Sequence, residues 1–284
     1  MSLLNEYLEL FTQIANRIPL PKIKSVYLPE SDRLVDGIKK KDEFGFVVLD
    51  DDSVGAFYTS FDNTLECLEK RYPDNLHLNL DSLSVIKHIT GSSLPMRAIA
   101  LGTINAVSQH IMKRAKFTTP DKKTTNSQST GISQAKAGER IGMIGYFAPL
   151  IERLLGKDIE ILVLEKDPKR VEPQQGVTVS ERIADLAQCD HILCTASTLI
   201  NDTLDEILQH STLAKTFSLI GPTGSSLPDL LFKHGVNAVG GFHFHDLPAL
   251  QQALSSNESW GHAGKKYQIT PDRYPGIYAL LKKF

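Results

Sequence analysis

Hydrophobic positions in the first part of the chain follow helical spacing in some segments and strand-like runs in others. Apolar residues recur every three to four positions over 3–18, and this helix is expected to end before Pro19. Two β-rich runs flank the Asp- and Ser-rich connection 50–53, which predicts a hairpin. The predicted elements are helices at 3–18, at 62–71 with Asp62 as its cap, and at 94–111, and strands at 23–28, 44–49 and 54–58. Helices packed on a small antiparallel sheet indicate an α+β domain.

After Gly138 the pattern changes to short apolar strands that alternate with helical segments. This alternation is typical of βαβ units and predicts a doubly wound, mostly parallel α/β sheet. The predicted strands are 140–144, 159–164, 191–194, 216–220 and 236–239, and the predicted helices are 148–155, 181–188, 202–210 and 229–234. The segment between the two patterns is polar and offers little to bury. The sequence therefore predicts domains at 1–116 and 139–284, joined by a polar linker at 117–138.

Composition narrows the class of protein without naming its function. A chain of 284 residues with 41% hydrophobic residues can form two domains with cores of their own. Its net charge of −2, with both signs interspersed, argues against a nucleic-acid partner. No apolar window is long enough to span a membrane, and the first ten residues lack the features of a signal peptide. The three cysteines have no Cys-x-x-Cys spacing and are interpreted as thiols in a reducing cytoplasm. We therefore expect a cytoplasmic protein, and the sequence leaves a homodimer open.

Polar and glycine residues follow four of the predicted strands in the second domain. Because the carboxyl ends of parallel strands share one edge of a sheet, where ligands bind in such folds, these residues predict a small-molecule site. The candidates there are Gly142, Gly145, Tyr146, Glu165, Thr195, Ser197, Asn201, Gly221, Pro222 and Thr223. Glu165 stands where an acidic residue accepts hydrogen bonds from ribose hydroxyls. Taken singly, each loop can also be an ordinary turn or helix cap, and Glu165 an ordinary surface carboxylate.

Two further patterns are candidates for ligand or metal binding. Asn105 lies in an otherwise apolar helix, so its amide must either bond a neighbouring backbone group or face the cleft between the domains. His243 and His245 are two positions apart and share one face if the segment is extended. With Asp246, or with His262 or water, they could bind a divalent metal, although histidines are more often structural.

The order of these motifs is similar to a known family. The runs 142–147, 164–168, 195–204, 220–222 and 231–235, together with 102–106 in the first domain, resemble the "putative heavy-metal chelation" domain family. The resemblance implies a Rossmann-like second domain with partial likeness to methyltransferases, an enolase N-terminal-like first domain, and a cleft between them. It carries Asn105, Gly145, Glu165, Thr195, Asn201 and Gly221 over as site candidates. The family pattern matches Asp246 but does not fix His243 or His245.

The sequence therefore predicts a small-molecule-binding protein whose activity is not established. The resemblance implies heavy-metal chelation, or condensation or hydrolysis of pterin-, flavin- or siderophore-like compounds. One alternative is an enzyme that uses S-adenosylmethionine or NAD, which Glu165 favours and the incomplete glycine fingerprint disfavours. The other is a non-catalytic metal-binding protein, favoured by the lack of an evident acid–base pair. The expected cofactor is a divalent metal or a nucleotide-like ligand, and no catalytic residue is assigned.

Overall fold

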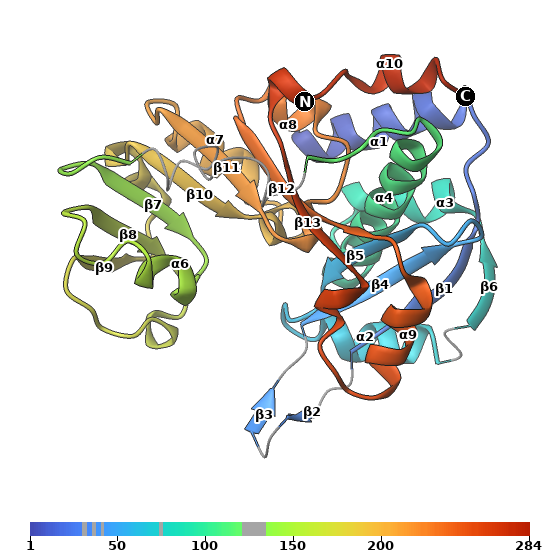
Figure 1. Cartoon of the computed structure of the whole chain (residues 1–284), viewed down its shortest axis with the longest axis horizontal. Coiled ribbons are helices and arrows are strands. Elements are labelled where there is room, and N and C mark those ends of the chain that lie inside the picture. Colours follow the sequence, from blue (N-terminus) through green and yellow to red (C-terminus); the bar gives the residue numbers. More distant parts are fainter. Residues whose placement is uncertain (30–32, 36–37, 41–42, 74–75, 121–134) are drawn as a thin grey trace.

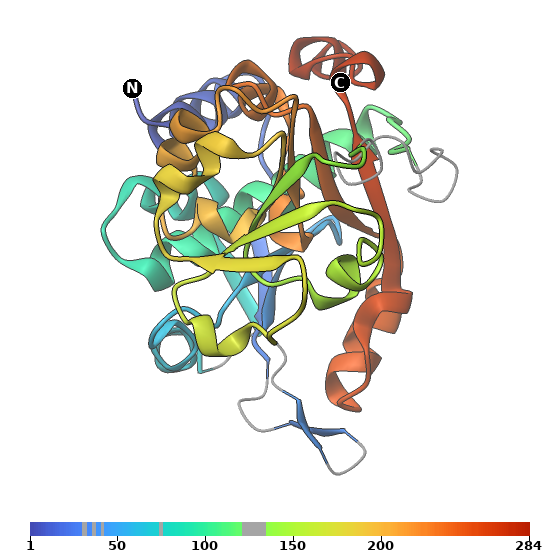
Figure 2. The ribbon, with the colours of Figure 1, turned by 90° about the vertical axis from the view of Figure 1, so that its left-hand side faces the viewer.

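The computed structural model describes residues 1–29, 33–35, 38–40, 43–73, 76–120 and 135–284, and these form an α+β domain followed by an α/β domain. In the first domain, four strands form a sheet in the order β5-β4-β1-β6, and all neighbouring pairs are antiparallel. A separate two-stranded hairpin, β2–β3, projects from the body of the molecule (Figures 1 and 2). The elements of this domain are α1 (Leu3–Ala15), β1 (Ile23–Tyr27), β2 (Arg33–Val35), β3 (Ile38–Lys40), β4 (Phe44–Leu49), β5 (Val54–Tyr58), α2 (Thr64–Arg71), β6 (Leu76–Leu80), α3 (Ser82–Ile86), η1 (Lys87–Thr90) and α4 (Leu94–Arg114).

The long helix α4 packs directly on β4 and β5. Gly55 makes this close approach feasible, because a Cβ atom there would lie 2.1 Å from the Gly102 carbonyl oxygen and 2.3 Å from the Ala106 amide nitrogen. The opposite face of the sheet is covered by the second domain. There the Phe46 ring makes edge contacts with Phe244 and Trp260, at centroid distances of 5.5 and 5.4 Å. The first sheet is therefore buried on both faces.

The second domain is a seven-stranded sheet in the order β13-β12-β11-β10-β7-β8-β9, parallel except for β13. The strands are β7 (Arg140–Ile144), β8 (Glu160–Leu164), β9 (Val177–Ser180), β10 (His191–Thr195), β11 (Thr216–Ile220), β12 (Ala238–Phe244) and β13 (Gly264–Ile269). The helices are α6 (Ala148–Glu152), η3 (Pro168–Arg170), η4 (Ile183–Gln188), η5 (Ala196–Leu199), α7 (Leu204–His210), η6 (Pro222–Gly224), α8 (Asp229–Lys233), α9 (Leu247–Ser255), η7 (Trp260–Ala263), η8 (Pro271–Arg273) and α10 (Ile277–Leu281). From β7 the chain adds strands on one side and then returns to β10 on the other, so the sheet is doubly wound.

The sheet extends away from the first domain, with β12 and β13 next to it and β9 at the far edge (Figure 1; Figure 2 puts that edge in front). The chain then comes back to the first domain, because the Tyr278 hydroxyl of α10 donates to the Gln13 side chain at 3.4 Å and Arg17 lies 4.9 Å from the Tyr278 ring centre. One hydrophobic cluster contains buried residues of both domains. The domain junction is therefore part of the core.

The prediction of an α+β domain followed by a doubly wound α/β domain is confirmed, but several elements differ. The sheet does not close at 236–239, since β12 continues to Phe244 and the antiparallel β13 follows. Both β9 and β13 are edge strands that contain polar residues, Thr178 and Ser180 in β9 and Lys265, Lys266 and Gln268 in β13, so they lack the apolar runs that mark buried strands. The segment predicted as a helix at 181–188 is a 3₁₀ helix from Ile183.

Asp62 does not cap α2 as predicted. It adopts a φ of 44°, and the helix starts at Thr64 after Asn63, which makes no side-chain cap bond. Residues 121–134 of the predicted linker lie outside the described residues, so the domain boundaries stay a prediction. All three cysteines are free thiols. Among the helices that the structure describes, none has the length and apolar character needed to cross a membrane.

Candidate functional site

The doubly wound sheet has its switch point between β7 and β10. Residues 145–148 follow β7, and Thr195 ends β10, which residues 196–201 follow. Gly145 turns the chain with a φ of +85°, which favours glycine. A Cβ atom there would lie 3.3 Å from the Thr195 methyl group, so the two loops are in contact. The Gly145 amide donates to the Leu164 carbonyl at 3.2 Å, which places Glu165 in the next loop along the edge. The structure therefore brings Gly145, Glu165 and Thr195 together, as predicted from the strand ends.

Polar side chains at the switch point bond mainly within their own loops. The hydroxyl groups of Thr195 and Ser197 are 3.0 Å apart, and the Asn201 side-chain oxygen accepts a hydrogen bond from the Thr203 hydroxyl at 2.7 Å. One carboxylate oxygen of Glu165 accepts from the Asp167 amide at 3.3 Å. All these side chains are partly exposed. Because their partners are local, they can turn to a ligand without breaking contacts between elements.

Gly142 and Tyr146 belong to the same segment but have different surroundings. Gly142 lies inside β7, where a Cβ atom would be 2.8 Å from the Ile192 side chain and 3.0 Å from the Cys189 sulfur. Its absent side chain thus allows close packing beneath the sheet edge. The Tyr146 hydroxyl is buried and makes no hydrogen bond to the residues that the structure describes. Such a group costs free energy unless water or a ligand bonds it.

The loop after β11, residues 221–227, differs from the switch-point loops because α4 holds it. We call it the clamp loop. The Thr223 carbonyl accepts from the Asn105 amide at 2.8 Å, and the Ser225 carbonyl accepts from Gln109 at 3.1 Å. The Leu227 amide donates to the Ser108 hydroxyl at 3.1 Å. Gly221 starts the loop with a φ of +122°, and the Pro222 carbonyl accepts from the Ser225 hydroxyl at 2.6 Å. The predicted candidates Gly221, Pro222 and Thr223 therefore lie in the domain junction.

Asn105, in the middle of α4, and Arg97, near its start, both donate hydrogen bonds to the second domain. The Asn105 side chain is 0% exposed, and its amide group also donates to the Ala56 carbonyl at 2.8 Å. It thus bonds backbone groups, one of the two alternatives for this residue, and does so within the junction. Arg97, 8% exposed, donates to the carbonyl oxygens of Ile200 and Gly91, each at 2.7 Å. Sequence reasoning missed Arg97, although a lone charge in an apolar helix was a usable signal.

His243 lies in β12, as the extended pattern required, and its Nδ1 contacts the Gln109 side-chain oxygen. Gln109 uses its amide nitrogen to donate to the Ser225 carbonyl, so the oxygen faces the imidazole and His243 carries its proton on Nδ1. Burial lowers the pKa of His243, and the nearby charges of His245 and Lys113 lower it further. The lone pair on Nε2 is thus kept unprotonated.

The other metal candidates are not gathered around His243. His245 is exposed just beyond the strand, His262 is exposed in η7, and the Asp246 carboxylate caps α9 by accepting from the Ala249 amide at 2.9 Å. Within the described ranges, no three His, Cys, Asp or Glu side chains come together to hold a metal. A metal role for His243, His245 and Asp246 stays a prediction.

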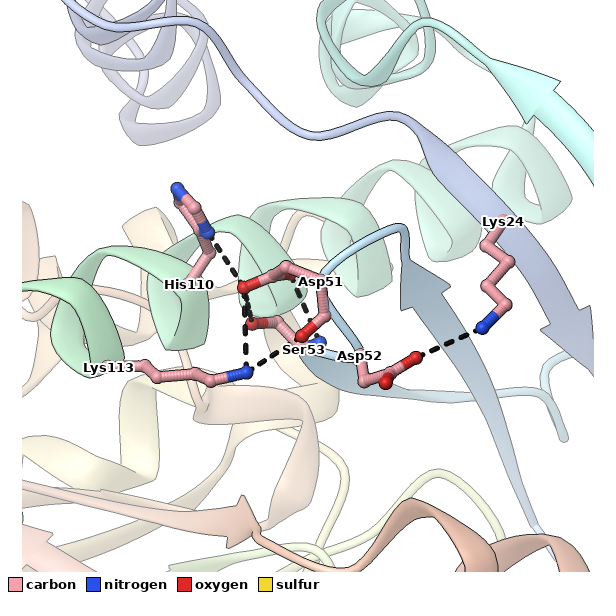
Figure 3. Close-up of polar contacts among 6 residues, drawn as sticks. All are labelled: Lys24, Asp51, Asp52, Ser53, His110 and Lys113. Carbon is pink, nitrogen blue, oxygen red and sulfur yellow. Dashed lines mark hydrogen bonds and ion pairs between the residues drawn. The ribbon is translucent and has the colours of Figure 1, made fainter.

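A polar cluster at the β4–β5 turn was not predicted (Figure 3). The Asp51 carboxylate accepts from His110 Nδ1 and from the Ser53 hydroxyl, both at 2.9 Å, and the Lys113 ammonium donates to the Asp51 carbonyl at 2.7 Å (Figure 3). Burial would raise the pKa of Asp51, but the hydrogen bonds from His110 and Ser53 outweigh it and lower that pKa to about 2. The cluster fixes the turn against the end of α4.

Comparison with known families decides where this chain belongs. The sequence profile of the DUF364 family, described as "Putative heavy-metal chelation", matches residues 130–271, which is half of the chain. The chain is a member of the DUF364 family. An uncharacterized protein of Methanocaldococcus jannaschii is 26% identical over 208 residues, covering 69% of this chain and 74% of that protein.

Two crystal structures of DUF364 proteins of unknown function share the fold. The protein from Desulfitobacterium hafniense has a TM-score of 0.66 at 19% identity, over 94% of this chain and 98% of that chain. The protein from Pyrococcus horikoshii has a TM-score of 0.67 at 19% identity, over 94% and 99%. These similarities establish family and fold but assign no activity. The enolase N-terminal-like description of the first domain stays a prediction.

Proposed function

We propose that this DUF364 protein binds a nucleoside-type small molecule at the switch point. The observation that carries the proposal is the contact of Gly145 with both the Thr195 side chain and the Leu164 carbonyl, which aligns Thr195 and Glu165 on one edge. In doubly wound sheets the carboxylate after the second strand accepts hydrogen bonds from ribose hydroxyls. Glu165 follows β8, the second strand of the domain, and is partly exposed. The Thr195 and Ser197 hydroxyls add donors and acceptors beside it.

The local backbone favours a nucleoside without a pyrophosphate. A pyrophosphate is bound by free amides at the start of the helix after the first strand, approached through a glycine-rich turn. Here that helix, α6, has five residues, and its second residue, Pro149, has no amide hydrogen. The pattern Gly142-x-x-Gly145 also lacks one glycine of a full fingerprint, and Phe147 and Pro149 follow it. These features support S-adenosylmethionine or a related nucleoside over NAD.

A binding panel tests the proposal. The protein is titrated calorimetrically with S-adenosylmethionine, S-adenosylhomocysteine, adenosine and NAD, and its native mass spectrum is recorded as purified. We expect at least one of the first three to bind, and NAD to bind no more tightly than adenosine. Absence of binding by every nucleoside, or NAD binding at least ten times more tightly than adenosine, contradicts the proposal. Turnover, including the condensation or hydrolysis of pterin-, flavin- or siderophore-like compounds that the family resemblance implies, is a separate question.

Metal binding is a second candidate function, and one contact favours it. The Gln109 oxygen holds the proton of His243 on Nδ1, which leaves Nε2 available as a ligand, the arrangement found around metal-binding histidines. The described residues do not fit a resident metal, because only His245 is a nearby second ligand and tetrahedral sites need about four. The structure therefore supports at most open, weak binding of a soft or borderline divalent ion.

Equilibrium dialysis against zinc, nickel and copper tests this candidate. Wild-type protein should bind more metal than the double variant His243→Ala, His245→Ala, and the difference should shrink at acidic pH, because a protonated imidazole cannot bind a metal. Equal uptake by the two proteins excludes these histidines as ligands.

A further inference from the structure

The face of α4 that meets the second domain has one end in which every polar group is bonded. The Gln109 amide nitrogen reaches the Ser225 carbonyl at 3.1 Å and the Tyr267 hydroxyl at 3.4 Å, and its oxygen bonds His243. The Ser108 hydroxyl donates to the Ile104 carbonyl at 2.7 Å and accepts from the Leu227 amide at 3.1 Å. Because these donors and acceptors already have partners, this part of the junction holds the two domains together without a ligand.

One turn towards the start of α4, the junction is incomplete. The Asn105 side-chain oxygen and the Thr223 hydroxyl are both buried without a hydrogen-bond partner among the residues that the structure describes. Asn105 is 0% exposed and Thr223 is 2% exposed, and the two residues are joined by the 2.8 Å bond from the Asn105 amide to the Thr223 carbonyl. An unbonded buried polar group costs roughly 1–3 kcal/mol, so two such atoms on residues joined by a hydrogen bond favour the binding of a further molecule.

The polarity of the missing partner follows from the contacts of Asn105. Its amide nitrogen lies 2.8 Å from two carbonyl oxygens, those of Ala56 and Thr223. A flipped amide would set its oxygen against both carbonyls, so the nitrogen must face them and the unbonded atom must be the oxygen. That oxygen can only accept a hydrogen bond. The Thr223 hydroxyl, on the residue whose carbonyl Asn105 bonds, can donate one.

We infer that the junction of β5, α4 and the clamp loop contains a subsite for a ligand that presents an N–H donor next to a carbonyl acceptor, as a lactam edge does. Asn105 accepts from the N–H, and Thr223 donates to the carbonyl. This subsite is separate from the nucleoside proposal, because β11, which precedes Thr223, and β8, which precedes Glu165, are three strand spacings apart, roughly 14 Å. It would hold a second molecule or the far end of a long one.

The subsite is covered in this structure, so a ligand enters only when η6 shifts. Thr223 sits between Gly221 and Gly224 in this short element, and a Cβ atom at Gly224 would lie 3.0 Å from the Ala196 side chain of η5. Through Ala196 the clamp loop therefore touches the loop that carries Thr195 and Ser197. The junction subsite and the switch-point site are thus in contact through η5.

The first test uses the ligand-free protein. Thr223→Val keeps the side-chain shape and removes only the hydroxyl, so the melting temperature should stay equal or rise. Ser225→Ala, in the same loop, is the control, because its hydroxyl bonds the Pro222 and Phe242 carbonyls and accepts from the Phe242 amide. This control should lower the melting temperature by roughly 2–4 °C. A loss for Thr223→Val as large as that of the control would show that the hydroxyl already has a partner and would overturn the inference.

The second test uses a matched pair of probes, 2-pyridone, which has the lactam edge, and N-methyl-2-pyridone, which lacks the N–H. In an NMR titration 2-pyridone should bind at least ten times more tightly than its methyl analogue. Thr223→Val should weaken 2-pyridone binding about threefold to tenfold, the value of one neutral hydrogen bond, whereas Thr223→Ser should retain it. Equal affinity for the two probes, no binding of 2-pyridone, or unchanged binding by Thr223→Val overturns the inference.

A crystal structure with 2-pyridone separates a ligand from a solvent molecule, since one ordered water that bonds both oxygen atoms and stays in place with the probe present also overturns it. Adenosine binding by Thr223→Val should equal that of wild type. Failure of the nucleoside proposal therefore shows in the adenosine titration, and failure of the junction subsite shows in the pyridone titration.

Discussion

Two polar loops lie at the same edge of the second sheet, the one after β10 and the clamp loop after β11, and their side chains have different partners. Both carry Ser and Thr, but only the clamp loop contains glycine. In the loop after β10, Thr195, Ser197 and Asn201 bond only to their own loop, and all three side chains are partly exposed. In the clamp loop, the backbone is bonded by Asn105, Ser108 and Gln109 of the first domain.

The difference shows what a polar loop at a strand end can be used for. A hydroxyl that bonds only a neighbour can exchange that neighbour for a ligand at little cost, because no contact between elements is lost. A carbonyl bonded by a helix of another domain supports the fold, and replacing its partner leaves a buried group unbonded. We therefore assign ligand binding to the side chains of the loop after β10 and domain assembly to the backbone of the clamp loop. The Ile200 carbonyl in the first loop, which accepts from Arg97 of α4, is likewise a contact between the domains.

The largest expected effect comes from an Asn→Asp substitution made at two places, at Asn105, which bonds the clamp loop, and at Asn201, in the loop after β10. Asn105→Asp replaces the amide donor with a buried carboxylate that faces the carbonyl oxygens of Ala56 and Thr223, so the free energy of unfolding should fall by about 3 kcal/mol or more. Asn201→Asp keeps the acceptor that the Thr203 hydroxyl uses, and it should change stability by less than about 0.5 kcal/mol. Urea unfolding of both variants measures the difference. Equal losses would remove the distinction between the two loops.

A matched pair of serine variants should give a smaller difference of the same sign. Ser108→Ala leaves the buried Leu227 amide without its acceptor, which should cost about 2 kcal/mol. Ser197→Ala removes a partly exposed hydroxyl that bonds Thr195, and its cost should stay below about 0.5 kcal/mol. Urea unfolding is again the measurement. A larger loss for Ser197→Ala than for Ser108→Ala would reverse our assignment of the two loops.

The smallest effect concerns the Asp51–His110 pair, which lies near the end of α4. The folded-state pKa of Asp51, about 2, lies below its ordinary value of 3.8. This pair therefore stabilises the protein fully above about pH 4, and the contribution disappears as the pH falls from about 4 to 2. Asp51→Asn should lower stability by about 1 kcal/mol at pH 7 and should flatten this part of the acid unfolding curve. An unchanged curve from pH 4 to 2 would show that the carboxylate is not stabilised by His110 and Ser53.

The sequence was sufficient for the inner strands of the second sheet and for its switch point because both depend on local signals. Short apolar strands predicted β7, β8, β10 and β11, and the positions of Gly145, Glu165 and Thr195 after three of them were enough to bring these residues to one edge. Edge strands such as β13 gave no such signal, since Lys265 and Lys266 are exposed and the strand has no apolar run. Their pairing depends on a neighbour far away in the sequence.

The different roles of the two loops could not be predicted, because they too depend on residues far away in the sequence. Nothing in the residues 221–227 indicates that α4, more than a hundred positions earlier, will bond their backbone. The two alternatives for Asn105 likewise needed the structure, because its partners Ala56 and Thr223 come from different domains. The Asp51–His110 pair was missed since the two residues are 59 positions apart.

The most direct measurement of our central claim compares Glu165→Ala with Ser108→Ala in one calorimetric titration with S-adenosylmethionine, beside an unfolding curve for each. We predict that Glu165→Ala weakens binding by about 1–3 kcal/mol, the value of a hydrogen bond to a charged group, and leaves stability within about 0.5 kcal/mol of wild type. Ser108→Ala should lose stability and retain its affinity at a temperature where it is folded. Unchanged affinity for Glu165→Ala, or an equal loss of affinity in both variants, would contradict the assignment of ligand binding to the switch point.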